Sequence, residues 1–221
     1  MKYITNLFHH KYLKSFFVLL FLFSIYFLVS AYSYVTAVSA DLSNSVFRLH
    51  VLANSDTTED QNLKYQVRDS LLSYMNQIAQ GVTSKEEVIS LVQTHQEDFK
   101  QIALQTIHEH GYDYSVSIHI GNFDFPTKEY GDISLPAGTY DALRVEIGEA
   151  QGHNWWCVMF PPLCFVDISS GIVPEESKDS LKNNLSDEEY SLISTDNKNE
   201  FNFKFKLIEM FENVKLKLAQ N

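Results

Sequence analysis

Apolar and polar side chains alternate in three separate stretches of the chain, residues 46–53, 114–120 and 142–147. Such alternation predicts strands with one buried face. The run that begins at Trp155 predicts another strand, and a shorter one is expected near residues 128–130. The polar positions of the alternating strands share the opposite face, which is either solvated or a docking surface. These positions are Arg48, His50, His119, Arg144 and Glu146.

Two longer stretches have the three- and four-residue apolar spacing of amphipathic helices. The first covers about residues 59–79, and Thr58 with Gln61 has the spacing of a capping box at its start. The second covers about residues 84–110. His95 falls on its apolar stripe, where we expect a packed and hydrogen-bonded imidazole. A small, mostly antiparallel sheet with two helices on one face predicts an α+β domain.

The first forty residues differ in composition from the rest of the chain. Lysines precede an apolar run at residues 16–29, and small-residue sites of the Val-Ser-Ala type follow at 29–31 and 38–40. This order is typical of a secretory signal. An uncleaved anchor is the alternative, because about 20 apolar residues span a bilayer. Residues 1–40 therefore predict a signal peptide or a membrane anchor, with the remainder outside the cytoplasm.

The remainder of the chain is acidic. The whole chain has a net charge of −11, and residues 1–40 contain three lysines and no acid, so the remainder is more negative still. Such a surface repels phosphate backbones, so we expect no nucleic-acid partner. Composition divides it into an exported domain at 41–168, a flexible acidic linker at 169–200 and a C-terminal amphipathic helix at 201–221.

Residues 153–165 concentrate the reactive side chains. They contain both tryptophans and both cysteines, and Pro161-Pro162 predicts that a strand enters a rigid turn there. The returning chain brings Cys164 back toward Cys157. In an exported domain the leading interpretation of this pair is a disulfide.

A cysteine hydrolase that uses Cys157 is the alternative. His153 precedes it by four positions, which in a strand separates the two side chains by about 13 Å. His50 or His119 would then have to serve as the base, and no nucleophile motif surrounds either cysteine. A zinc site built from His153, Cys157, Cys164 and another histidine lacks the close paired spacing of structural zinc sites. We therefore expect no catalytic set, no metal and no cofactor.

Several motifs lie within residues 46–168. They are residues 48–56, Asp60-Gln61, Lys64, residues 67–69, residues 135–144 and, most specifically, residues 152–164. Together these motifs resemble the stage II sporulation protein R family. His50 stands where arginine is more usual in that family.

This resemblance implies a non-enzymatic signalling protein of sporulation. Such proteins are exported from the forespore into the space between the two septal membranes. There they activate a membrane-embedded aspartic-type protease of the mother cell, which processes the precursor of a sigma factor. An exported hydrolase and a wall-associated structural protein are the alternatives. The residues expected to bind the partner are Arg48, His50, Arg144, His153, Asn154, Trp155 and Trp156.

Overall fold

A computed structural model describes residues 2–164, 173, 175–194 and 210. The chain forms two compact units, Met1–Val38 and Ser39–Asn221. Helix α1 (Lys2–Ser45) contributes to both units. Its stretch Tyr12–Ser30 is long and apolar enough to cross a membrane, a property that signal sequences share. The N-terminal unit is thus compatible with the expected signal peptide or anchor.

The second unit contains a four-stranded sheet in the order β2–β5–β1–β6. Strand β1 pairs with β5 in parallel, and the other two pairings are antiparallel. This mostly antiparallel sheet confirms the expected α+β class. Its strands are β1 (Phe47–Leu52), β2 (Val116–Phe125), β5 (Gly138–Ile147) and β6 (Asn154–Phe160).

Strands β3 (Lys128–Tyr130) and β4 (Ile133–Leu135) form a separate hairpin. We expected the first of these strands but not the second. Leu135 precedes a Pro-Ala-Gly sequence that is typical of a turn, and this signal obscured the strand.

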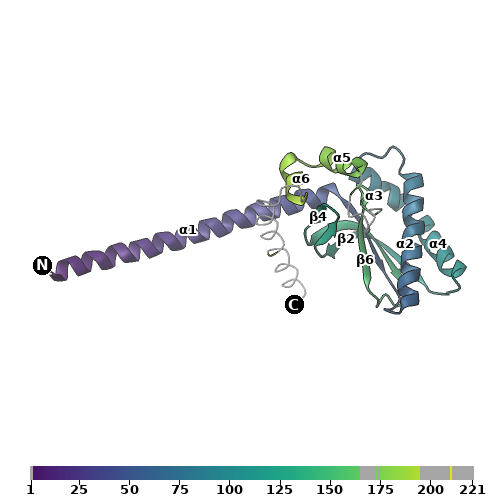
Figure 1. Cartoon of the computed structure of the whole chain (residues 1–221), viewed down its shortest axis with the longest axis horizontal. Coiled ribbons are helices and arrows are strands. Elements are labelled where there is room, and N and C mark those ends of the chain that lie inside the picture. The colour runs from purple at the N-terminus through teal and green to yellow at the C-terminus, as the bar shows by residue number, and fades with distance from the viewer. Residues whose placement is uncertain (1, 165–172, 174, 195–209, 211–221) are drawn as a thin grey trace. The chain divides into compact units, whose positions relative to one another are not determined.

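Three helices cover one face of the sheet: α2 (Thr58–Ile78), α3 (Lys85–Thr94) and α4 (Gln96–Glu109). Figure 1 shows α2 and α4 side by side against the strands. The core lies between these helices and the sheet. It is formed by the apolar stripes of α2 and α4 and by the odd-numbered positions of β1, which are buried. Its members include Leu49, Val51, Val67, Leu71, Phe99 and Ala103.

The second predicted helix is two helices in the structure. His95 ends α3 and precedes α4, so it does not lie on a continuous apolar stripe. Its Nδ1 atom lies 2.8 Å from the Tyr74 hydroxyl and 2.7 Å from an Asp98 carboxylate oxygen. The expected hydrogen-bonded imidazole is therefore present, but these polar partners hold it at a helix junction, with 31% of its side chain exposed.

The start of α2 is capped one residue earlier than the sequence suggested. Thr57 is the N-cap, and its hydroxyl accepts from the Asp60 N–H. Gln61, expected in a capping box, instead donates to the Ser55 carbonyl. The Asp60 carboxylate accepts from Asn54 and Ser55. The loop before α2 is therefore fixed by its own side chains.

The face opposite the helices is not open along β1, which corrects our expectation for two residues. Arg48 is 0% exposed and His50 is 5% exposed. The Arg48 guanidinium lies 4.1 Å from the Phe125 ring centre and 4.7 Å from that of Tyr140. Aromatic residues of β2 and β5 thus cover β1 on this face.

Residues 169–200 were expected to be a linker, but their described part contains two helices, α5 (Glu175–Asn184) and α6 (Asp187–Ile193). Their apolar residues are buried, and Ser186 and Glu189 form a capping box at α6. The acidic composition masked this pattern, since the acids lie between the buried positions. The buried residues are Leu181, Leu185, Leu192 and Ile193. The helix expected at 201–221 lies outside the described residues apart from Met210.

Candidate functional site

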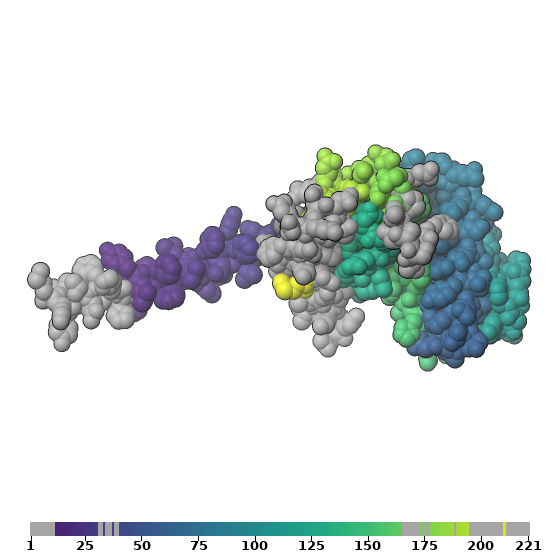
Figure 2. Space-filling view, in the orientation of Figure 1, coloured from purple at the N-terminus to yellow at the C-terminus, as the bar shows by residue number. Residues whose placement is uncertain are grey.

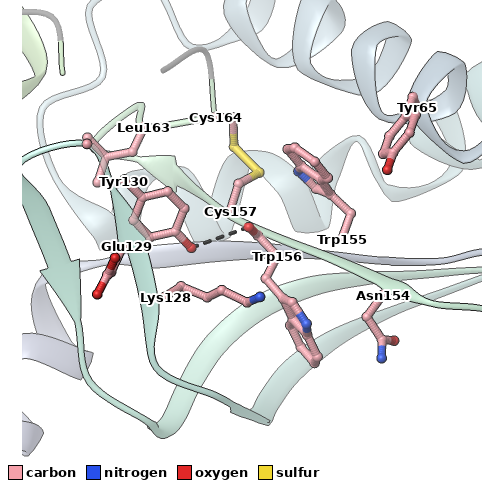
Figure 3. A pocket seen from close by; sticks show the side chains of 11 residues that line it. Tyr65, Lys128, Glu129, Tyr130, Asn154, Trp155, Trp156, Cys157, Leu163 and Cys164 are labelled. Carbon is pink, nitrogen blue, oxygen red and sulfur yellow. Dashed lines mark hydrogen bonds between the residues drawn. A yellow bond between two sulfur atoms is a disulfide. The ribbon is translucent and has the colours of Figure 1, made fainter. Parts of the chain in front are cut away.

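A groove of about 390 Å³ lies along the first part of β6 (Figure 3), and we call it the β6 groove. In Figure 2, β6 (green) lies between the hairpin region (teal) and α2 (blue). The walls of the groove come from β6, from the turn that follows it, from the hairpin and from α2. The lining residues are Tyr65, Lys128, Glu129, Tyr130, Gly131, Asn154, Trp155, Trp156, Cys157, Leu163 and Cys164.

Strand β6 is an edge strand of the four-stranded sheet. The Trp156 carbonyl accepts from the Tyr130 hydroxyl at 3.3 Å, and the Val158 carbonyl accepts from the Leu163 N–H at 3.0 Å. Neither partner belongs to β1. Because main-chain groups of successive strand residues point to alternate sides, the even-numbered residues of β6 face away from β1. The main-chain groups of Asn154 and Trp156 therefore point to the outer edge, where the groove lies.

The two tryptophans flank this edge on opposite faces of the sheet (Figure 3). Trp155 meets the Tyr65 ring edge-to-face at 5.5 Å, and the Arg68 guanidinium lies 4.2 Å from the Trp155 ring centre. Trp156 stacks on His50 at 3.7 Å between ring centres. Both indoles are thus held in place by packing before any partner arrives.

His50 supports Trp156 as a neutral imidazole. Its Nε2 atom lies 2.8 Å from the Asn154 side-chain oxygen, so Nε2 carries the proton and donates. Burial lowers the pKa of His50 to about 4, and the nearby Arg144 and Arg48 act in the same direction. The Nδ1 atom has no hydrogen-bond partner among the described residues. The ring therefore fixes both Asn154 and Trp156 at neutral pH.

Positive charge gathers around the β6 groove. Arg48 donates to the Tyr130 hydroxyl at 2.8 Å and has no carboxylate partner within the described chain. Lys64 is 1% exposed and donates to the Gln61 side chain and the His153 carbonyl. Burial lowers the pKa of Lys64. Lys128 lines the groove, and Arg68 lies against Trp155. Four cations are therefore in or behind its walls, and the lining contains one carboxylate, Glu129.

The disulfide expected between Cys157 and Cys164 is present, with 5.1 Å between the two Cα atoms. Both residues line the groove and close it at the turn. Cys157 is 1% exposed, and its sulfur is bonded rather than available as a nucleophile. The described residues contain no cluster of histidine, cysteine and acidic side chains that would hold a metal.

Removing this disulfide is expected to lower the free energy of unfolding by about 2.5 kcal/mol, the value for so short a loop in the chain-entropy model. The measurement is urea denaturation of the full chain with Cys157→Ser and Cys164→Ser together. A reducing agent should destabilise the native chain by a similar amount and leave the double variant unchanged. Equal midpoints for the oxidised native chain and the double variant would contradict this expectation.

The structure places the expected partner-binding residues in four locations. Asn154 and the two tryptophans line the β6 groove. His153 lies at its end, 80% exposed, with its ring against the Asp56 carboxylate. Arg48 and His50 lie behind the groove, whereas Arg144 is on β5 and pairs with Glu146 at 2.7 Å.

Sequence reasoning missed the other walls of the groove. Tyr65 and Arg68 are three positions apart on α2, a spacing that places two side chains on one helix face. That spacing was visible, but nothing in the sequence indicated which strand this face would meet. Lys128 and Tyr130 were placed on a short strand, yet their position beside β6 depends on how the hairpin folds back.

Residues 43–170 match the family model described as stage II sporulation protein R. The stage II sporulation protein R of Bacillus subtilis (strain 168) is 38% identical over 138 residues, which cover 62% of this chain and 62% of the relative. The match therefore spans less than two thirds of that relative's length. No solved structure matches the chain. Every residue that lines the β6 groove lies inside the family-matched range.

Proposed function

The chain belongs to the stage II sporulation protein R family, and we propose that it is an exported signalling ligand that activates a membrane protease. The partner is a membrane-embedded aspartic-type protease of the mother cell, which then processes the precursor of a sporulation sigma factor. The observation that carries this proposal is the β6 groove. It combines an exposed sheet edge, two preorganised indoles and surrounding positive charge within the family-matched range.

Two further features support action outside the cytoplasm. Tyr12–Ser30 has the length and composition of a membrane span or a signal sequence. The Cys157–Cys164 disulfide suits an oxidising compartment, because cytosolic thiols are kept reduced. We therefore place the second unit in the septal intermembrane space, either released or anchored.

Activation requires that the ligand bind the active state of the protease more tightly than the inactive state. Asn154, Trp155 and Trp156 provide the contact, with His153 at its end. Arg48 and His50 act from behind by holding Tyr130 and Trp156 in position. Buried aromatic anchors of this kind usually dominate the energy of a protein interface.

The test is cleavage of the sigma-factor precursor in a non-sporulating host that makes the protease, the precursor and the full chain. Trp155→Ala is expected to lower the cleavage rate about thirtyfold, since an interface anchor contributes about 2 kcal/mol. Tyr112→Ala, which removes an aromatic ring outside the groove, should leave cleavage unchanged. If folded Trp155→Ala chains act normally, the groove is not the contact.

Export is tested separately with Phe21→Arg and Leu22→Arg together, which place two charges in the apolar stretch. Cleavage should be lost because the second unit stays in the cytoplasm. Cleavage by this variant would contradict the extracytoplasmic proposal. An absence of cleavage with the folded and exported native chain would overturn the signalling proposal itself.

A further inference from the structure

We propose that the β6 groove takes an extended acidic segment of the partner protein, which adds as a new strand to the outer edge of β6. This inference rests on the proposed function, because it names the kind of segment that the signalling partner inserts. It concerns the conformation and the charge of the bound segment, both of which are inferred from the groove. Three features of the groove support it.

The first feature is the main chain of β6. Asn154 and Trp156 direct their main-chain groups toward the groove, away from β1. The Trp156 carbonyl already accepts from the Tyr130 hydroxyl, so an added strand would bond the Asn154 main chain and the Trp156 N–H. An edge of this kind is a template for a further strand. Peptide recognition by strand addition uses such main-chain bonds for affinity and neighbouring pockets for specificity. About four residues of an extended segment match the exposed part of β6, since both chains rise about 3.3 Å per residue.

The second feature is the position of the groove on both faces of the sheet edge. Trp155 and Tyr65 lie on the helix side, and Trp156 and Lys128 lie on the other (Figure 3). Successive side chains of a strand point to opposite faces. An added strand would therefore place alternate side chains against the Trp155 wall and the Trp156 wall. The disulfide limits the segment at one end.

The third feature is charge. Lys128 lines the groove, Arg68 packs on Trp155, and the buried Arg48 and Lys64 lie behind Tyr130 and Tyr65 of the wall. This positive charge stands out because the whole chain has a net charge of −11. The acids nearby are Glu129 in the wall, Asp69, which pairs with Arg68, and Asp56, which holds His153 at the end of the groove. A segment with carboxylates is attracted to this cluster, whereas a second copy of this acidic chain is repelled overall. Charge complementarity therefore favours an acidic partner segment over self-association.

The experiment begins with a library of random eight-residue peptides displayed on phage, selected against the full chain in lipid nanodiscs. Acidic residues should be enriched in the selected peptides. One of these is then synthesised with a fluorophore, and its affinity for variants of the full chain is measured by fluorescence anisotropy. Because the readout is binding of this peptide, it does not depend on the protease.

The decisive comparison is between Asn154→Pro and Asn154→Ala. Both variants lose the side chain that contacts His50, but only proline loses the outward N–H. Proline is tolerated where a strand N–H faces away from the sheet. Asn154→Pro should bind the peptide about tenfold more weakly than Asn154→Ala. Lys128→Glu should bind about tenfold more weakly than Lys128→Gln, because it reverses a charge at the wall.

Equal affinities for the proline and alanine variants would overturn strand addition. Selection of basic or uncharged peptides, or of none, would overturn the acidic assignment. If analytical ultracentrifugation shows that the full chain dimerises and that Asn154→Pro abolishes the dimer, the outer edge of β6 binds a second copy of this chain instead. If the peptide results hold but the native chain triggers no precursor cleavage, the signalling proposal fails and the groove assignment stands. If the native chain triggers precursor cleavage but the proline and alanine variants bind the peptide equally, strand addition fails and the signalling proposal stands.

Discussion

Acidification from pH 6.5 to pH 4 is expected to lower the free energy of unfolding by about 3 kcal/mol through His50 alone. Burial, together with Arg144 and Arg48, lowers the pKa of His50 to about 4 in the folded chain from 6.5. The unfolded chain therefore takes up the proton first as the pH falls. The contribution of His50 is fully present above pH 6.5 and is lost as the pH approaches 4.

The geometry explains why this ring resists protonation. Its Nε2–H already donates to Asn154, and a second proton on Nδ1 would be buried without an acceptor in the described structure. His50→Gln removes the titration and keeps a side chain that can donate to Asn154. Urea denaturation at a series of pH values should show that the free energy of unfolding falls more steeply with decreasing pH for the native chain than for this variant.

The comparison between native and variant chains matters because the protonation of other groups also lowers the free energy of unfolding as the pH falls. Hydrogen bonds hold the pKa of Asp60 low despite the opposing effect of burial, so its protonation also destabilises the fold. That contribution is common to both chains and cancels in the difference. Identical pH profiles for the native chain and His50→Gln would contradict the assignment to His50.

Gly152→Ala is expected to lower the free energy of unfolding by about 3 kcal/mol, at the upper end of the usual cost of overpacking. A Cβ atom at this position would meet the Ser55 carbonyl and the Ala53 side chain at less than van der Waals distance. Gly152 also donates to the Ala53 carbonyl at 2.9 Å. The clash is with main-chain atoms between β1 and the start of α2, so a side-chain rotation does not relieve it.

Gly121→Ala is the matched control, because a Cβ atom at Gly121 meets nothing within 4 Å and its backbone is not in the left-handed region. Its effect on the free energy of unfolding should stay within about 0.5 kcal/mol. Urea denaturation of the two variants and the native chain tests the difference. Similar midpoints for both variants would show that residues 53–55 can move aside at little cost.

The strand pattern could be predicted because alternation depends only on neighbouring residues. It placed β1 and β5 well, and it identified the inward side of each. It could not show that Phe125 and Tyr140 would cover the other side of β1, since those contacts join distant segments. Arg48 and His50 therefore appeared exposed in the sequence and are buried in the structure.

The candidate site was recognisable only in part for the same reason. Trp155, Trp156 and both cysteines stood out by residue type and by their concentration in one short run. Tyr65 and Lys128 had no such local signal, because each is an ordinary surface residue of its own element. They become part of the site only through the packing of α2 and the hairpin against β6.

The attachments that hold β6 determine which molecule loses conformational entropy when the two associate. The disulfide holds the strand at Cys157, and the start of the strand is held by Lys64 on the His153 carbonyl and by Asp56 on the His153 main chain and ring. A strand fixed in this way has little conformational freedom left to lose. Ordering about four residues of an incoming segment costs about 4–8 kcal/mol, and this cost falls on the partner. A partner segment that its own fold already holds extended would thus bind far more tightly than the same residues in a flexible tail.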